Sequence, residues 1–298
     1  MKIGHDVQGG SAQFTGAIES TTGKIAGVTI GGLLNGGTNQ DTGSIVSDGN
    51  LGPIKIGRDL TGGSVTGSGT LDASGYIGST AGRIVSVAIG GSIISGIDNS
   101  TMNQAGGDLT RNASIRAADD IGSLTVTGSI AGNRGTNGDS LVFISARGQL
   151  VKGTTTDLAI GKVSVGGLVE FVQILAGYKT DLTAFNGDAQ IGAVTVGGDW
   201  IASDLVAGAK NSGSPKFGDM NDAPIGGGSA TITAKIASIT IGGQVVGTPS
   251  PATTDHFGFV AQQIGSFHAG LFAAVLTAGT DPAIQLSLPT ADVSIHEV

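Results

Sequence analysis

One stretch of the chain, Ile25 to Leu34, constrains the fold more than any other feature because the chain repeats it. It reads I-A-G-V-T-I-G-G-L-L: apolar, two spacers, apolar, small, apolar, two glycines, a variable residue and a last apolar residue. We find eight copies, the first truncated at Met1, and a decayed copy that begins at Phe267. A motif that recurs roughly every 20–50 residues is typical of solenoids. Aligned on the second apolar position, the complete copies give one column: Val28, Ile54, Val87, Leu124, Val163, Val194 and Ile239.

The apolar positions of each copy alternate with short, mostly polar positions. Two residues after the first column lies a second apolar column: Ile30, Ile56, Ile89, Val126, Val165, Val196 and Ile241. Between the two columns lie Thr29, Lys55, Ala88, Thr125, Ser164, Thr195 and Thr240. A period of two predicts a strand with one buried face. A third column, three residues before the first, should also face inward: Ile25, Leu51, Ile84, Ile121, Ile160, Ile191, Ile236 and Ile264.

Glycine ends each predicted strand. It directly follows the strand at Gly31, Gly57, Gly90, Gly166, Gly197 and Gly242, and it fills the next position at Gly32, Gly91, Gly128, Gly167, Gly198 and Gly243. Without a Cβ, such a pair lets the backbone take a positive φ and turn a corner where stacked copies crowd together. The chain should then return inward at Leu34, Leu60, Ile93, Ile130, Val169, Trp200 and Val245.

A single copy is too narrow to bury its apolar face, so the copies must stack, each strand pairing in parallel with its equivalent in the next copy. The sequence therefore predicts an all-β, single-stranded parallel β-helix (a β-solenoid) of about nine coils, wound right-handed and roughly 40 Å long. Composition agrees: 54 glycines, few aromatics and only 13% charged residues among 298 suit a long thin core of β-branched residues. Helical and disordered chains have a different composition.

The spacing between copies varies along the chain because extra residues enter some coils. We place them after the final apolar position and before the next coil's first strand, at Gly96–Arg111, Asn133–Ser140, Ala176–Asp188 and Ala207–Ser229. Because the repeat register determines where each loop leaves the body, we expect the loops along one edge, with any recognition surface there. The motif disappears from about Ala273. The expected organisation is a solenoid domain over 1–272 and a C-terminal flank or cap over 273–298.

Charge and hydropathy exclude several partners. The net charge of -8, without a basic stripe, argues against nucleic acid and gives no polybasic membrane anchor. The longest apolar run, Ala269 to Ala278, is too short to span a bilayer. Since Met1 lies inside a repeat and no signal peptide precedes it, we expect the chain to be part of a longer protein. An open solenoid edge invites pairing, so we expect self-association through solenoid ends or neighbouring repeats.

The I-G-x-V-x-I-G-G-x-L copies resemble the glycine-rich solenoid repeats of very large secreted and autotransporter-like bacterial surface proteins, such as those of planctomycetes. The resemblance covers roughly residues 1 to 272 and specifies a scaffold, since a fold does not determine function. It implies an extracellular or cell-surface location and a passenger or adhesin role, for which surface glycans are candidate partners. It carries over no functional residue. The absence of cysteine fits a secreted and a cytosolic protein equally.

The best candidate for catalysis is the run Arg116, Asp119 and Asp120. Polysaccharide hydrolases built on parallel β-helices gather several aspartates with Arg and Lys on adjacent coils. Aligning neighbouring coils places Gly49 and Asn50 opposite the two aspartates, so no carboxylate cluster is predicted and a solvated turn is the favoured interpretation. We therefore expect no enzyme activity.

Residues that could bind a metal ion or a sugar are also sparse. Trp200 lies on an inward column, which favours a core role over a sugar-stacking platform. Aspartate is irregularly placed, unlike in calcium-binding nonapeptide repeats, and turn capping is its expected role. One oxygen-rich cluster in the longest loop, Asp219, Asn221 and Asp222, has ligands for a hard cation such as calcium, although an ordinary polar loop is favoured. Four histidines lack metal-site or triad spacing: His5, His256, His268 and His296.

The expected function is a non-enzymatic structural or adhesive segment of a larger extracellular bacterial surface protein, a rigid rod that displays loops. Two alternatives stay open. A polysaccharide-binding or polysaccharide-degrading β-helix would need a cluster of acids in a groove. An ice-binding solenoid would need a flat Ser/Thr ladder, which Ser123 with Thr125 supplies in part, but Lys55 and Lys162 interrupt it.

Overall fold

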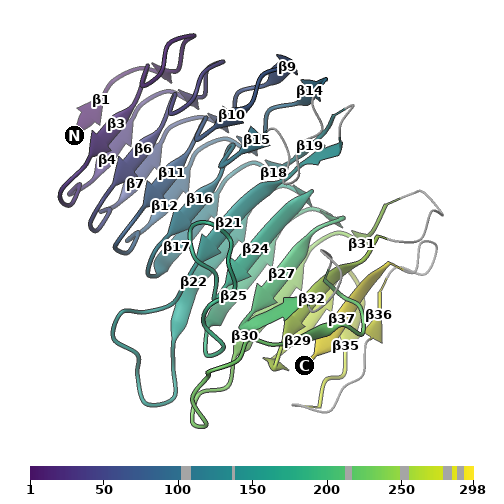
Figure 1. Ribbon diagram of the computed structural model, residues 1–298. Helices are drawn as coiled ribbons and strands as arrows, with labels where there is room; N and C mark the ends of the chain where they lie inside the picture. Colours follow the sequence, from purple (N-terminus) through teal and green to yellow (C-terminus); the bar gives the residue numbers. More distant parts are fainter. Residues whose placement is uncertain (102–108, 136–137, 212–216, 249–254, 278–283, 287–291) are drawn as a thin grey trace.

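The computed structural model describes residues 1–101, 109–135, 138–211, 217–248, 255–277, 284–286 and 292–298. Over these residues the protein is all-β, without a helix, and its strands stack as the rungs of a parallel β-solenoid (Figure 1). Each complete coil contributes one short strand to each of three sheets. The predicted fold class is confirmed, whereas the right-handed sense of winding stays a prediction.

The first sheet contains the repeat strand itself. Ten of its described strands run parallel: β1 (Lys2–Ile3), β4 (Val28–Ile30), β7 (Ile54–Ile56), β12 (Val87–Ile89), β17 (Ile121–Val126), β22 (Leu158–Val165), β25 (Gln190–Val196), β30 (Lys235–Ile241), β33 (Gln263–Ile264) and β34 (Phe267–Ala269). The register matches the predicted columns coil by coil, so that Val28 pairs with Ile54, and Val194 pairs with Ile239. The decayed copy at Phe267 keeps this register.

The second sheet begins after the glycine corner, as predicted. Its strands are β2 (Val7–Gln8), β5 (Leu34–Asn35), β8 (Leu60–Thr61), β13 (Ile93–Ile94), β18 (Ile130–Ala131), β23 (Val169–Glu170), β26 (Trp200–Ile201) and β31 (Val245–Val246). Each of the predicted inward residues pairs with its equivalent, from Leu34 with Leu60 to Trp200 with Val245.

The third sheet lies outside the repeat motif, and sequence analysis missed it. Its parallel strands are β3 (Ile18–Ser20), β6 (Ile45–Ser47), β11 (Ile77–Ser79), β16 (Ile115–Ala117), β21 (Val142–Ala146), β24 (Val172–Ala176), β27 (Asp204–Ala207), β32 (Phe257–Ala261) and β37 (Val293–Glu297). One aliphatic or aromatic residue per strand points inward, and the next but one is small, as in Ile115 and Ala117. This sheet closes the third side of each coil.

The interior is one continuous apolar column assembled from all three sheets. Val194 is 1% exposed whereas Thr195 beside it is exposed, and the same alternation holds at Ile239 and Thr240. The period-two prediction is therefore confirmed. Each fully buried Val, Leu or Ile side chain stabilises the coil by roughly 1.5–3 kcal/mol. Because a coil contacts only its neighbours, this stability is additive along the rod.

The corner glycines act differently from the prediction. Among the described residues, none of the strand-ending glycines from Gly31 to Gly242 has a positive φ, so the predicted left-handed corner is wrong. They are needed because stacked corners touch. A Cβ on Gly57 would collide with the carbonyl oxygen of Gly31, and one on Gly90 would collide with that of Gly57. Close approach of backbones in successive coils therefore requires glycine at this position.

The inserted loops leave the rod along two edges, which corrects the prediction of one edge. Between the second and third sheets are β9 (Val65–Gly67), β10 (Leu71–Asp72), β14 (Asp98–Ser100), β15 (Leu109–Thr110), β19 (Asn133–Gly135) and β20 (Gly138–Ser140). Between the third and first sheets are residues 147–157, 177–189, 208–211 and 217–234, which include β28 (Ala209–Asn211) and β29 (Asp222–Pro224). Figure 1 shows the two groups on opposite sides. Both edges border the third sheet.

The two ends of the rod differ. At the N-terminal end, β1, β2 and β3 each pair with one described strand only, so all three sheets present an edge. At the C-terminal end, β35 (Phe272–Ala274) and β36 (Ile284–Gln285) are antiparallel to β34 and β37. The last parallel strand of the first sheet, β34, ends at Ala269, whereas β37 extends the third sheet to Glu297. The division at 272 stays a prediction.

Candidate functional site

The loops of the two edges meet over the outer face of the third sheet and enclose a groove of about 480 Å³. Asp72 and Arg111 come from the first edge, and Thr180 comes from the second. Arg116 on β16 and Phe143 on β21 form the floor. Loops held over a rigid sheet are a common setting for binding residues. This groove is the best candidate for a functional site.

The third sheet aims Arg116 into the groove. Ile115 and Ala117 point to the core, so the residue between them must point outward. On the preceding coil the equivalent position is Gly78, which lets the Tyr76 ring lie over the strand, since a Cβ there would overlap that ring.

The guanidinium of Arg111 is neutralised within the groove. It forms a two-pronged ion pair with Asp72, in which Nε lies 2.8 Å from Oδ1, and it lies over the Tyr76 ring at 5.3 Å. Thr110 also donates to Asp72 at 2.8 Å. Burial would raise the pKa of Asp72, but the hydrogen bonds from Arg111 and Thr110 outweigh it and hold that pKa below its usual value.

Arg116 is not neutralised. Its side chain donates from Nη1 to the carbonyl oxygen of Thr180 at 2.9 Å and lies 5.3 Å from the centroid of the Phe143 ring. The residue is 5% exposed, and its Nε has no hydrogen-bond partner. Among the described residues no carboxylate forms an ion pair with it. Desolvation lowers the pKa of Arg116 to about 10, so the group stays charged at neutral pH.

The three predicted catalytic candidates do not form one site. Asp119 and Asp120 lie at the corner beyond β16, where Asp119 pairs with Arg147 at 2.5 Å and Asp120 with Arg83 at 2.8 Å. Their coil stacks directly on the coil of Gly82 and Arg83, so the alignment with Gly49 and Asn50 was one coil too far. Both carboxylates are buried and held by arginines of other coils. They tie coils together, and the solvated turn expected for them is wrong.

The cation candidate Asp219, Asn221 and Asp222 lies in one turn of the longest loop. Asp219 accepts hydrogen bonds from the backbone and side-chain nitrogens of Asn221. Asp222 instead turns to the body, where its carboxylate lies 3.3 Å from Nδ1 of His296 and accepts a bond from the Gly218 backbone. No group of three or more His, Cys, Asp or Glu among the described residues is arranged to hold a metal ion. Calcium at this turn stays a prediction.

Trp200 occupies the core, as favoured from its column. It is fully buried, its Nε1 donates to the Ser203 carbonyl at 2.9 Å, and its ring packs 5.0 Å from that of Phe259. It is therefore inaccessible to a sugar.

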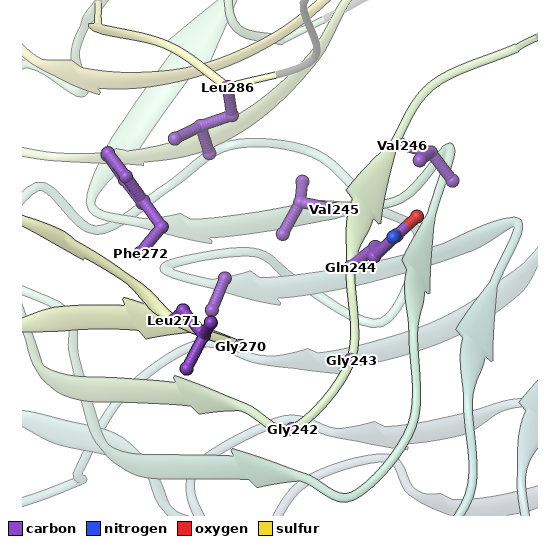
Figure 2. Close-up of a pocket in the computed structure, with 10 residues that line it drawn as sticks. Gly242, Gly243, Gln244, Val245, Val246, Gly270, Leu271, Phe272 and Leu286 are labelled. Carbon is purple, nitrogen blue, oxygen red and sulfur yellow. The ribbon is translucent and has the colours of Figure 1, made fainter.

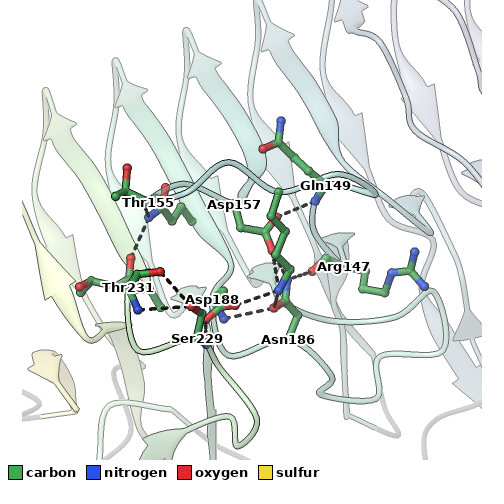
Figure 3. A network of polar contacts seen from close by, with 12 residues as sticks. Arg147, Gln149, Thr155, Asp157, Asn186, Asp188, Ser229 and Thr231 are labelled. Atoms are coloured by element: carbon green, nitrogen blue, oxygen red, sulfur yellow. Dashed lines mark hydrogen bonds and ion pairs between the residues drawn. The ribbon is translucent and has the colours of Figure 1, made fainter.

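A second polar cluster fastens the loops between the third and first sheets (Figure 3). The ammonium of Lys152 lies 2.9 Å from Asp188, 3.2 Å from Asp157 and 3.0 Å from Oδ1 of Asn186. Asp188 also accepts from the Ser229 backbone at 2.6 Å, so three consecutive loops are joined. The aspartates are buried, and these contacts satisfy them. The cluster has the features of a structural fastening, with no unpaired group to offer a ligand.

The hollow at the C-terminal end is apolar and larger, about 620 Å³, and lies beside β31 and β35 (Figure 2). Val245, Leu271, Phe272 and Leu286 surround it. Among the described residues that line it none is charged, so the described lining lacks the convergent polar groups that orient a ligand.

Sequence reasoning missed Asp72, Tyr76, Arg111 and Phe143, since none belongs to the repeat. The signal that was present is R-N-A-S-I-R, in which two arginines flank an inward-facing Ile115. Comparison with family models, with curated proteins and with solved structures finds no match to this chain. In the described part of the chain no helix is long and apolar enough to cross a membrane.

Proposed function

We propose that this chain is a non-enzymatic rod segment of a larger bacterial surface protein, exposed outside the cell, which displays its loops for adhesion or assembly. The observation that carries the proposal is the division of the molecule into a uniform three-sided rod and two rows of loops that meet over one sheet. A rod of this kind places a recognition surface at a distance from its anchor, and the repeat resembles that of secreted surface proteins.

Assembly is the second part of the proposal. The three edge strands at the N-terminal end offer unpaired backbone groups in the register of the next coil, so a neighbouring repeat or a second copy can extend the sheets there. The antiparallel strands β35 and β36 at the other end do not continue the parallel ladder. Association is therefore expected to be directional, with the strands at the N-terminal end accepting the neighbouring repeat or second copy.

Antibodies against the purified chain test the location. They should label intact cells of the bacterium that makes the protein, and external protease should remove the label. Labelling that requires permeabilised cells would overturn an extracellular role. A glycan array probed with the purified chain then tests adhesion, and a chain that binds no glycan leaves assembly as the remaining role.

The runner-up is a polysaccharide-degrading enzyme. It predicts release of reducing ends or unsaturated sugars from polysaccharides, abolished by Asp119→Ala or Asp120→Ala. We expect no release, because arginines engage both carboxylates in ion pairs. Activity lost in either variant would replace the rod proposal with an enzyme.

A further inference from the structure

The unpaired charge of Arg116 has no structural explanation in the groove. Taking a guanidinium out of water is unfavourable unless a carboxylate compensates its charge. The bond to the Thr180 carbonyl uses one of five N–H groups, and Nε is left without a partner. Buried polar atoms without partners are rare in proteins, so the unpartnered Nε of Arg116 calls for an explanation.

We propose that this groove binds an acidic saccharide, whose singly charged carboxylate or sulfate ester pairs with the guanidinium of Arg116. The charge of the ligand follows from the groove. Arg111 and Asp72 neutralise each other, which leaves two charged side chains in the lining: Arg116 on the floor and Asp181 at the exposed rim. Asp181 accepts a hydrogen bond from the Thr183 backbone. A doubly charged phosphate would bring excess negative charge beside these two carboxylates, so a singly charged anion fits better.

The residues of the rim favour an acidic sugar over other anionic ligands. Thr80 and Thr110 are exposed residues of the rim; their hydroxyls donate to Asp48 and Asp72, which leaves the hydroxyl oxygens as acceptors. The side chains of Asp72 and Arg111 are 34% and 35% exposed, so polar groups surround the opening. Leu182 adds an apolar contact. A sugar has hydroxyls that match such a rim and an apolar ring face, whereas an acidic peptide would use the cation alone. The volume lies in the range of small-molecule sites.

The proposal rests on the adhesive role, and calorimetry on the whole chain tests it. The probes are a short oligogalacturonate, a sulfated galactose oligomer and the neutral galactose oligomer of equal length. We expect one of the charged oligomers to bind and the neutral one to bind at least about tenfold more weakly. Arg116→Met should abolish this binding, and Arg116→Lys should restore part of it, because lysine keeps the charge without the planar fork. Arg83→Met, outside the groove, is the matched control and should bind as the parent does.

A thermal melt separates ligand binding from a structural role. Because Arg116 has no charge partner, Arg116→Met should keep or raise the melting temperature. The proposal is overturned if neither charged oligomer binds, if the neutral oligomer binds equally well, or if Arg116→Met binds like the parent. Equal binding of polyglutamate would assign the groove to acidic peptides and overturn the saccharide. If no saccharide binds but antibodies still label the cell surface, the groove proposal fails and the rod proposal stands. The two proposals are therefore tested separately.

Discussion

The first two coils and the coils from Val142 onward share the same inner columns but differ on the outer face of the third sheet. In the first coils the outward residues of that sheet are Glu19, which is exposed, and Val46, which is half-buried. In the later coils the equivalent Leu175 and Val206 are buried under the loops. These loops bring Tyr178, Ala209, Phe217 and Ile225 and form a second apolar cluster with Val260.

The difference shows that the repeat and the insertions have separate tasks. The repeat builds a core that is uniform from end to end, and it does so with strands of two or three residues in the first coils. The insertions convert one solvent-facing sheet into a second buried layer, and β22, β25 and β30 lengthen to seven or eight residues beside them. The groove at Arg116 lies where the bare face gives way to the covered one.

The largest effect is expected from Val194→Asp in the inner column that both regions share. An unpaired carboxylate would enter an apolar interior, so we expect the free energy of unfolding to fall by about 4 kcal/mol or more. Denaturant unfolding followed by circular dichroism measures it. Thr195→Asp, one position along and exposed, is the control and should change stability by less than about 0.5 kcal/mol. Equal losses in the two variants would contradict the alternation of faces.

A smaller effect should appear in the outer layer of the later coils alone. Leu175→Ala should destabilise the loop-covered coils by about 2–4 kcal/mol, since it leaves a cavity in the second cluster. Val46→Ala, in the same outward column of the bare coils, should cost less than about 1 kcal/mol. Hydrogen exchange resolves the two regions. A cost at Val46 equal to that at Leu175 would show that the two faces are not different.

The inner columns of the first two sheets could be predicted because the glycine corner keeps them at a constant distance from the repeat. The register from Val28 to Phe267 follows directly from that alignment. The third sheet was harder to predict, because its strands lie outside the repeated motif. Insertions before it vary in length, and from Val142 onward insertions also follow it. Without that sheet the two edges merge into one, which is why the loops were assigned to a single edge.

The groove could not be predicted from the sequence either, because it is built on the third sheet. Arg116 was noticed only beside Asp119 and Asp120, as part of one run, although strand β16 sends it outward while the aspartates follow at the corner. Asp72, Thr180 and the floor come from different coils. Pairing between Arg111 and Asp72, 39 residues apart, depends on which coil stacks on which.

Stability should depend on pH in the loop-covered coils. Asp204 is buried on the outer face of the third sheet, and desolvation raises its pKa to about 7, against hydrogen bonds from Gly258 and Gln173. Near pH 5 the folded state holds a proton that the unfolded state has lost, so this contribution to stability is fully present below about pH 4 and is lost as the pH rises through about 7.

Asp204→Asn tests this dependence. We expect the parent to lose stability in its later coils between pH 5 and pH 8, and the variant to lose less, as measured by hydrogen exchange at the two pH values. Asp48→Asn, exposed in the bare coils, should keep the parent's dependence. A parent that gains stability from pH 5 to pH 8 in these coils, with the gain removed by Asp204→Asn, would reverse the sign and contradict the raised pKa.

The smallest expected effect concerns ice binding, for which the two regions again differ on the outer face of the first sheet. In the later coils Thr125, Ser164, Thr195 and Thr240 stand in register on consecutive strands about 4.8 Å apart, a spacing able to order water. Exposed lysines interrupt the same face at Lys55 in the early coils and beside Ser164 in the later ones. A mobile ammonium group prevents an ice surface from contacting the flat strip closely. Serine and threonine are also common on exposed strand faces because of their β-propensity alone. We therefore expect no thermal hysteresis from the purified chain, and none from the double variant Thr125→Leu with Thr195→Leu. A clear freezing gap in the parent that the double variant loses would assign the later coils to ice and overturn the adhesive rod.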